Sequence, residues 1–470
     1  MTNSGPTMAG GAAPPPVIPT FRSAGAAALF SRSVIIIAGF ANSLLLPLVL
    51  DQRGIGQYFL LQIMIAGLAT FCQLGLTFSI PRQVTDAMAR NDLGRARRLA
   101  ATILCLSAGL GLLVAGAVVV ASPWIAEFLD PAERATWIVA LPIIGATASL
   151  ASLTAVIVEL LRAVHAVRAA ANLATLASIF AAAYAGLVMM AGERATLSGA
   201  LLAILFGSLC SVALGLVLFW LRSNRWPRSA HEPVQATAVL RETLPNFLTT
   251  LCLFGLANLD ILILGSLGSM NEVAQYGLAL RFSASMVMPL AIANSAAAPL
   301  AVHARSTDDI TTLDGILARV VFGGAGVAAV LYLGFAAAGY GFIALWNADY
   351  LGAYWLTLVL GLGNVLHACG GAAGILLMIW GDQKRAFMIV VATSALTVIL
   401  CFLGYRFGGM FGLAFFAAFG NVLQVACFVL RVRTQFKVDP SLLGQWRAGL
   451  AGRGASRPSL RRPFPERLGQ

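Results

Sequence analysis

Two ionisable residues stand inside long apolar segments near the middle of the chain. Asp260 lies in the segment 244–266 and Arg281 in the segment 274–300, and the polar turn GSLGSMNE joins the two segments. A charge inside a membrane-spanning helix costs about 2.5–3.5 kcal/mol on insertion scales, so such a residue needs an explanation. A carboxylate can exchange a cation, and a guanidinium can hold an anion. These two residues are therefore the first candidates for chemistry.

The short turn predicts that the two charges lie at one depth. If both segments cross the membrane as helices, each charge sits about 10 Å below the outer edge at about 1.5 Å rise per residue. We therefore expect a salt bridge between Asp260 and Arg281. Two interpretations stay open: the pair staples the hairpin together, or it contacts an ion or a substrate and re-forms between conformational states.

Motifs for covalent chemistry are missing from the rest of the sequence. It contains no GxxxxGK[ST], no HExxH and no CxxC, and its four histidines are scattered. The seven cysteines fall in apolar stretches without paired spacing. We therefore expect no enzymatic activity, no cofactor and no metal site, and transport becomes the default hypothesis.

The composition requires a membrane. Of the 470 residues, 59% are hydrophobic and only 11% are charged, whereas about 25% of a soluble domain is charged. The mean hydropathy is +0.85. About 20 apolar residues span the hydrocarbon core as a helix. On that measure the sequence predicts twelve spans: 25–50, 56–80, 99–121, 136–161, 169–191, 197–221, 244–266, 274–300, 316–339, 351–379, 386–405 and 410–430.

The basic residues orient these spans. With the N-terminus in the cytoplasm, all but five of the 31 lysines and arginines fall on the cytoplasmic side. Such an excess is the positive-inside signal, and it places both termini in the cytoplasm. The net charge of +12 thus reflects clusters at membrane edges, which argues against a nucleic-acid partner.

The predicted fold class is an all-α integral membrane protein with two six-helix lobes. The N-terminal stretch is rich in Gly, Ala and Pro, which predicts a disordered tail. The C-terminal stretch is basic, which predicts a disordered tail attracted to anionic membrane lipid. The predicted parts are the N-terminal tail 1–24, the first lobe 25–221, the cytoplasmic linker 222–243, the second lobe 244–430 and the basic cytoplasmic tail 431–470.

The two lobes repeat at an offset of 218 residues. Under this offset Gln57 coincides with Gln275, Tyr58 with Tyr276 and Pro81 with Pro299. Six helices per half give a parallel repeat about an axis along the membrane normal, which suits alternating access. The counterparts of Asp260 and Arg281 are Asn42 and Ile63, so the two charges are specific to the second lobe.

Several stretches resemble one transporter family. GIGQYFLLQ and LGLTFSIPRQVTDAMARNDLGRARRL resemble the helix 1–2 turn and first cytoplasmic loop of the polysaccharide flippases, which belong to the multidrug/oligosaccharidyl-lipid/polysaccharide exporter superfamily. LPNFLTTLCLFGLANLDILILGSLGSMNEVAQYGLALRF resembles helices 7 and 8 of that family, and LWNADYLGAYWLTLVL and MIWGDQKRAF resemble its helix 9–11 region. The resemblance covers residues 25–430.

The resemblance implies a flippase that moves a lipid-linked oligosaccharide to the outer leaflet of the bacterial inner membrane. The substrate would be a polyprenyl-pyrophosphate-linked oligosaccharide, held in a central cavity lined mainly by helices 1, 2, 7 and 8. Arg281, Arg32 and Arg82 are the candidates for binding its pyrophosphate, and Asp260 is the candidate for coupling to a cation gradient.

Two alternatives remain at the level of the sequence. Sparse interior charge leaves open a cation-coupled multidrug exporter of the same superfamily. A non-transporting membrane scaffold for glycan assembly, partnered with a glycan polymerase, is the third hypothesis.

Overall fold

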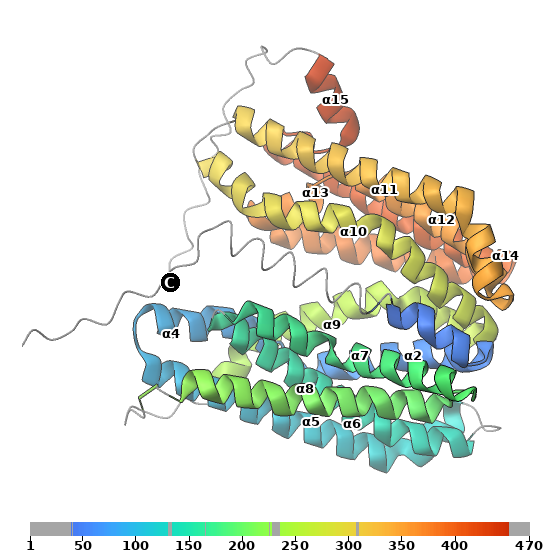
Figure 1. The fold of residues 1–470 in the computed structure, drawn as a ribbon. Coiled ribbons are helices and arrows are strands. Elements are labelled where there is room, and N and C mark those ends of the chain that lie inside the picture. Colours follow the sequence, from blue (N-terminus) through green and yellow to red (C-terminus); the bar gives the residue numbers. More distant parts are fainter. Residues whose placement is uncertain are drawn as a thin grey trace, which may run out of the picture.

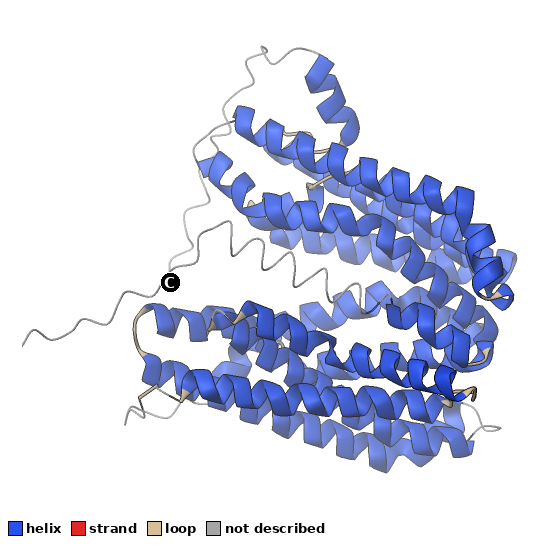
Figure 2. Cartoon of the chain, viewed as in Figure 1, coloured by secondary structure: helices blue, strands red, loops and turns tan. Residues whose placement is uncertain are grey.

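The computed structural model describes residues 39, 41–129, 134–164, 166–224, 226–227, 236–306 and 310–450, and these residues form helices joined by short turns (Figures 1 and 2). No strand occurs among them, so the predicted all-α class is confirmed. In the first half, residues 41–49 are helical and precede α2 (Gln52–Gln73), α3 (Leu76–Ser79), the π-helical turn η1 (Ile80–Val84), α4 (Thr85–Ala89), α5 (Leu93–Leu129), α6 (Arg134–Ala163), α7 (Val167–Ala191) and α8 (Leu197–Ser223). The second half contains α9 (Ala236–Leu267), α10 (Met270–Ser306), α11 (Ile310–Trp346), the 3-10 turn η3 (Ala348–Tyr350), α12 (Leu351–Ala368), α13 (Ala373–Ile379), α14 (Gln383–Phe436) and α15 (Leu442–Leu450).

Many of these helices suit a bilayer. Nine helices of the described part of the chain are long and apolar enough to cross a membrane. The longest, α14, has 54 residues and is broken by Gly409 at φ 59° and ψ −149°, a conformation that favours glycine. Its two limbs therefore cover the predicted segments 386–405 and 410–430. The chain is a multi-pass membrane protein, while twelve spans and cytoplasmic termini remain predictions.

The C-terminal region is more ordered than its composition indicated. Helix α14 continues to Phe436, Lys437 turns the chain in the left-handed region at φ 58°, and α15 follows. The expectation of a disordered tail is wrong for residues 431–450, because specific hydrogen bonds, described below, hold this segment against the second half. Residues 451–470 lie outside the described part.

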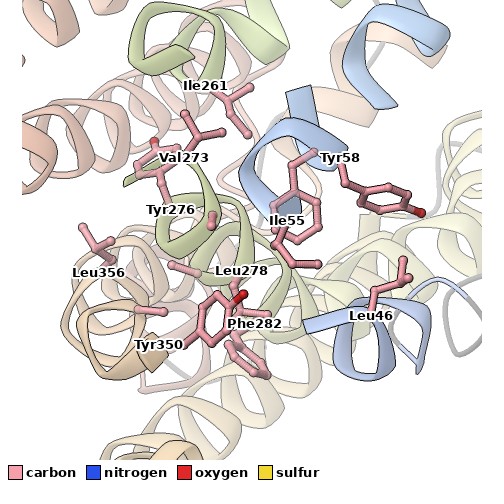
Figure 3. Packing of buried hydrophobic residues seen from close by; sticks show 14 of the residues in the cluster. Leu46, Ile55, Tyr58, Ile261, Val273, Tyr276, Leu278, Phe282, Tyr350 and Leu356 are labelled. Carbon is pink, nitrogen blue, oxygen red and sulfur yellow. The ribbon is translucent and has the colours of Figure 1, made fainter. Parts of the chain in front are cut away.

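The helices gather into two bundles that meet along α2, α9 and α10 (Figure 1). Helix α2 packs on α6 of its own half and on α9 and α10 of the other. Figure 3 shows the buried cluster at this junction, to which α2 contributes Ile55 and Tyr58 and α10 contributes Tyr276 and Phe282. The halves thus share one core at their contact.

Close backbone approach fixes this contact. A Cβ on Gly56 would lie 1.9 Å from the carbonyl oxygen of Met270, so α2 can pass the start of α10 only because residue 56 is glycine. Nearby, Asn347 Nδ2 donates to the Pro47 carbonyl at 3.0 Å and Gln52 Nε2 donates to the Asp349 carbonyl at 3.1 Å. Hydrogen bonds therefore join the two halves at the end that carries the predicted outer loops.

Candidate functional site

Asp260 is held inside the second half by a tyrosine. It lies on α9, and its carboxylate Oδ2 accepts a hydrogen bond of 2.8 Å from the Tyr276 hydroxyl on α10. Its Oδ1 accepts from the Ile261 backbone N–H at 2.8 Å. No cation of the described residues forms an ion pair with this carboxylate. Two neutral donors therefore satisfy part of its hydrogen-bonding capacity and leave its charge uncompensated.

Arg281 reaches from the second half to the first. Its Nη2 donates to Gln62 Oε1 on α2 at 3.0 Å, and its Nη1 donates to the Gly277 carbonyl one turn earlier on α10, also at 3.0 Å. The guanidinium carbon stands 3.8 Å from the centroid of the Phe59 ring, a cation–π geometry. In the described part of the chain no carboxylate pairs with Arg281, so this cation too lacks a counter-ion.

The predicted salt bridge between Asp260 and Arg281 is not formed. The apolar pattern predicts that the second segment begins near residue 274, but α10 begins at Met270, immediately after the turn. The earlier start moves Arg281 about 6 Å deeper along the helix axis at about 1.5 Å per residue. Tyr276 therefore stands opposite Asp260, and Arg281 reaches α2 instead. The staple interpretation fails in this form.

The repeat appears as a matching pair of side-chain contacts. In the first half Asn42 Nδ2 donates to the Tyr58 hydroxyl oxygen at 3.0 Å, in the register that Asp260 and Tyr276 occupy in the second half. Tyr58 also accepts from Gln62 Nε2 at 2.7 Å. The 218-residue offset aligns these two tyrosines in the sequence, but it does not indicate that they contact the residues at 42 and 260.

A polar cavity adjoins Asp260. Its volume is about 520 Å³, and residues of α9, α10, α12 and both limbs of α14 line it. Asn421 Nδ2 donates to Asn364 Oδ1 at 2.9 Å across this space, and Asn364 Nδ2 donates to the Ser283 carbonyl at 2.9 Å. Thr397 and Gln424 add further oxygens to the lining. One carboxylate among hydroxyl and amide oxygens is a donor set for a hard cation.

The remaining predicted site residues are not brought to this place by the described structure. Arg82 lies in η1, and its side chain is outside the described atoms. Arg32 falls outside the described residues. Among the described residues no group of three or more His, Cys, Asp or Glu side chains could hold a metal ion. The candidate site therefore consists of Asp260 with its cavity, and of Arg281 at the contact between the halves.

Three partners were missed by the sequence analysis: Tyr276, Gln62 and Phe59. Tyr276 and Gln62 are ordinary interior polar residues in a sequence. Only the packing of α9 against α10 brings Tyr276 to Asp260, and only that of α2 against α10 brings Gln62 to Arg281. The repeat carried one usable signal, because residues 42 and 58 and residues 260 and 276 are both separated by sixteen positions. A polar residue recurring at that spacing before a tyrosine predicts the contact.

The comparisons with known proteins agree with this architecture. A family model described as polysaccharide biosynthesis protein matches residues 24–303. A search of curated proteins finds no match. Among solved structures, an inward-facing multidrug resistance MATE family transporter of the MOP superfamily shares 14% identity, covers 91% of this chain and 100% of its own, and superposes with a TM-score of 0.71.

Two further structures extend the likeness. The outward-facing conformation of a MATE family transporter covers 87% of this chain and 94% of its own at 14% identity, with a TM-score of 0.61. A MOP superfamily transporter from Pyrococcus furiosus, described by the reverse polarity of its binding pocket, gives the same four values. These likenesses concern the fold, whereas the family model matches the sequence over more than half of the chain. The protein therefore belongs to the polysaccharide biosynthesis protein family and has the fold of the MATE transporters of the MOP superfamily.

Proposed function

We propose that this protein is a flippase that moves a lipid-linked oligosaccharide across the bacterial inner membrane for surface polysaccharide biosynthesis. Its substrate is a polyprenyl-pyrophosphate-linked oligosaccharide, and it works by alternating access of its two halves without covalent chemistry. The observation that carries the proposal is Arg281, a cation without a described counter-ion at the contact between the halves of a polysaccharide biosynthesis protein.

The contacts of Arg281 suit exchange for an anionic group. All its described partners are neutral: the Gln62 amide, the Gly277 carbonyl and the Phe59 ring. A hydrogen bond between two charged groups is roughly twice as strong as one between neutral groups. A pyrophosphate oxygen therefore outcompetes the Gln62 carbonyl for the guanidinium. Binding of the headgroup would then release a bond between α2 and α10, while Arg32 and Arg82 are the further cations proposed for the same anion.

Asp260 supplies the proposed coupling site. Its carboxylate borders a cavity with hydroxyl and amide oxygens, where a cation can lose its water shell to protein oxygens. A cation bound in this cavity would add positive charge beside the Asp260 carboxylate, between α9, α10 and α14. Because α9 and α10 both contact α2, that change can reach the contact between the halves.

The test is complementation of a cell that lacks its own flippase. Replacing Arg281 with Ala removes a hydrogen-bonding cation worth about 1.5–3 kcal/mol, so surface polysaccharide should fall by about tenfold to a hundredfold. Arg281→Lys keeps the positive charge but lacks the forked set of N–H donors of a guanidinium, so it should retain part of the activity. The matched control is Arg406→Ala, an exposed arginine on α14.

Normal polysaccharide from correctly inserted Arg281→Ala protein would contradict the proposal. A further measurement separates loss of substrate transport from loss of folded protein. Radiolabelled lipid-linked oligosaccharide should accumulate on the inner face of the membrane when Arg281→Ala is the sole copy, and protein abundance should match the wild type. Loss of the protein itself would be seen in that abundance and corrected by comparing equal amounts.

A cation-coupled multidrug exporter is the second candidate function. The observation that favours it is the single carboxylate beside a polar cavity, Asp260, within a MATE fold. An exporter of cationic drugs would raise resistance when expressed in a drug-sensitive cell and would lose that effect with Asp260→Asn. Complementation of polysaccharide synthesis without drug resistance favours the flippase. A glycan polymerase remains the proposed protein partner.

A further inference from the structure

Helix α15 presents an apolar and basic face that no other described element covers. Leu443 is 63% exposed and Trp446 is 56% exposed, and Arg447 is exposed beside them. These positions lie three and four residues apart, so they share one face of the helix. The opposite face carries Gly444 and the buried Gln445. Leucine, tryptophan and arginine on one side form the pattern of a helix lying at a membrane surface.

The inner face of α15 is fixed to the second half by a network around Asp439. Arg433 pairs with the Asp439 carboxylate at 2.6 Å, and the Ser441 hydroxyl donates to it at 2.7 Å. Gln445 Nε2 donates to the Asp439 carbonyl at 2.6 Å. A Cβ on Gly444 would lie 1.9 Å from Asp439 Cγ, so the helix sits directly on this network. The exposed face is therefore held in one direction.

The position of α15 matches the edge of a membrane. The helix contacts α11 and stands crosswise to it (Figure 1). Its N-terminal Leu442 donates a backbone hydrogen bond of 2.8 Å to the Cys369 carbonyl between α12 and α13. Helix α11 is long and apolar enough to span the membrane over Thr312–Trp346. Gly371, between α12 and α13, lies against both the Pro440 carbonyl of the loop before α15 and Val321 of α11, near the predicted cytoplasmic end. A helix crosswise to the spans at that level lies along the bilayer surface.

The charge of the region identifies the lipid. From Arg431 to the end, the sequence carries nine basic residues and two acidic residues, Asp439 and Glu466. Basic residues at the cytoplasmic surface are attracted to anionic lipid by about 1 kcal/mol each. We propose that α15 is an in-plane anchor whose Leu443 and Trp446 enter the inner leaflet while Arg447 binds anionic phospholipid headgroups.

Photo-crosslinking of the full chain tests this anchor. A benzophenone amino acid replaces Trp446 or Leu443, and the purified protein is reconstituted into phosphatidylcholine vesicles with or without phosphatidylglycerol. Irradiation should add the mass of one phospholipid at both positions. The matched control places the same amino acid at Arg95, an exposed position at the start of α5 predicted to face the cytoplasm, and should give little lipid adduct.

A second variant tests whether the charge of Arg447 contributes to the selectivity for anionic lipid. In mixed vesicles, Arg447→Gln in the chain labelled at residue 446 should lower the ratio of phosphatidylglycerol to phosphatidylcholine adducts by about fivefold, the equivalent of about 1 kcal/mol. Absence of lipid adducts at 443 and 446 would overturn the anchor. The same labelled chains are also irradiated in cells. If they crosslink predominantly to another protein, this face of α15 binds a protein and the proposal is wrong. The inference does not depend on the transported substrate.

Discussion

The contact of Asn42 with Tyr58 in the first half and that of Asp260 with Tyr276 in the second join equivalent positions but differ in charge and in direction: Tyr58 accepts from the amide, whereas Tyr276 donates to the carboxylate. Both join a residue to a tyrosine sixteen positions later, at distances of 3.0 Å and 2.8 Å. In the first half the partner is an amide, and in the second it is a carboxylate beside a polar cavity. The tyrosine contact therefore belongs to the architecture of each half, whereas the carboxylate is present at this position in the second half alone.

Removing the charge while keeping the contact should have the largest effect. Asp260→Asn gives the second half the amide that the first half has. The Tyr276 hydroxyl can then donate to the amide oxygen or, as Tyr58 does, accept from the amide nitrogen. If the charge binds the coupling cation, transport should fall by about tenfold or more, which corresponds to about 1.4 kcal/mol or more of lost binding. The measurement is surface polysaccharide in the complemented cell at equal protein level.

The exchanged pair sharpens this result. Asn42→Asp combined with Asp260→Asn moves the carboxylate to the equivalent position of the first half. Transport should stay low, because the cavity described here adjoins residue 260. Full recovery of transport would mean that either half can carry the charge, and the assignment of a site to the second half would then be abandoned.

A carboxylate facing Arg281 should have the next largest effect. Gln62→Glu would give the guanidinium a counter-ion across the contact between α2 and α10. A charge-assisted bond is roughly twice as strong as the present one and competes with an anionic substrate. Transport should fall more in Gln62→Glu than in Gln62→Leu, which places in the first half the residue type of its counterpart, Leu280. Initial rates of lipid-linked oligosaccharide flipping in vesicles would compare the two.

Equal transport by Gln62→Glu and Gln62→Leu would contradict this role of Arg281. The variant Gln57→Glu is a suitable control, because it adds the same charge to α2 without replacing the partner of Arg281. A decrease confined to Gln62→Glu identifies the bond with the guanidinium as the cause.

Replacing either tyrosine with phenylalanine should lower the thermal stability of the protein by a similar amount, but the two variants should differ in transport. Tyr276→Phe removes one bond to a charged group, worth about 1.5–3 kcal/mol, and Tyr58→Phe removes two neutral bonds, worth about 0.5–1.5 kcal/mol each. Both variants should therefore unfold at similarly lowered temperatures in detergent. Transport per folded molecule should decline in Tyr276→Phe alone. A matching decline in Tyr58→Phe would show that the contact itself, rather than the charge, matters.

Much of the fold could be predicted because the bilayer imposes long apolar segments. Most of the described helices overlap predicted spans, and the break at Gly409 falls between the last two, whereas the predicted span 351–379 is divided between α12 and α13. The repeat was also visible, since it preserves Gln57, Tyr58 and their counterparts. Orientation rests on basic residues in loops, several of which lie outside the described residues.

The site was predicted in part. Asp260 and Arg281 stand out in a sequence because charge is rare within spans, but their partners do not. The salt bridge was wrong because the turn between α9 and α10 is only two residues long, and a shift of four residues moves a side chain by about one helical turn. Helix α15 was missed because a basic stretch looks disordered until Asp439 and its hydrogen bonds are seen.

The hydrogen bond from Leu442 to Cys369 has a consequence for how the protein is made. The Cys369 residue caps the C-terminal end of α12. The described donor to its carbonyl is the backbone N–H of Leu442, which follows α14 in the chain. A ribosome delivers that donor only after both limbs of α14 have been synthesised. The break between α12 and α13 therefore stays incomplete while the last spans enter the membrane. A chain cut after Phe436 would lack the Leu442 N–H that the Cys369 carbonyl accepts, so the end of α12 is completed only once α15, the last described helix, has been made.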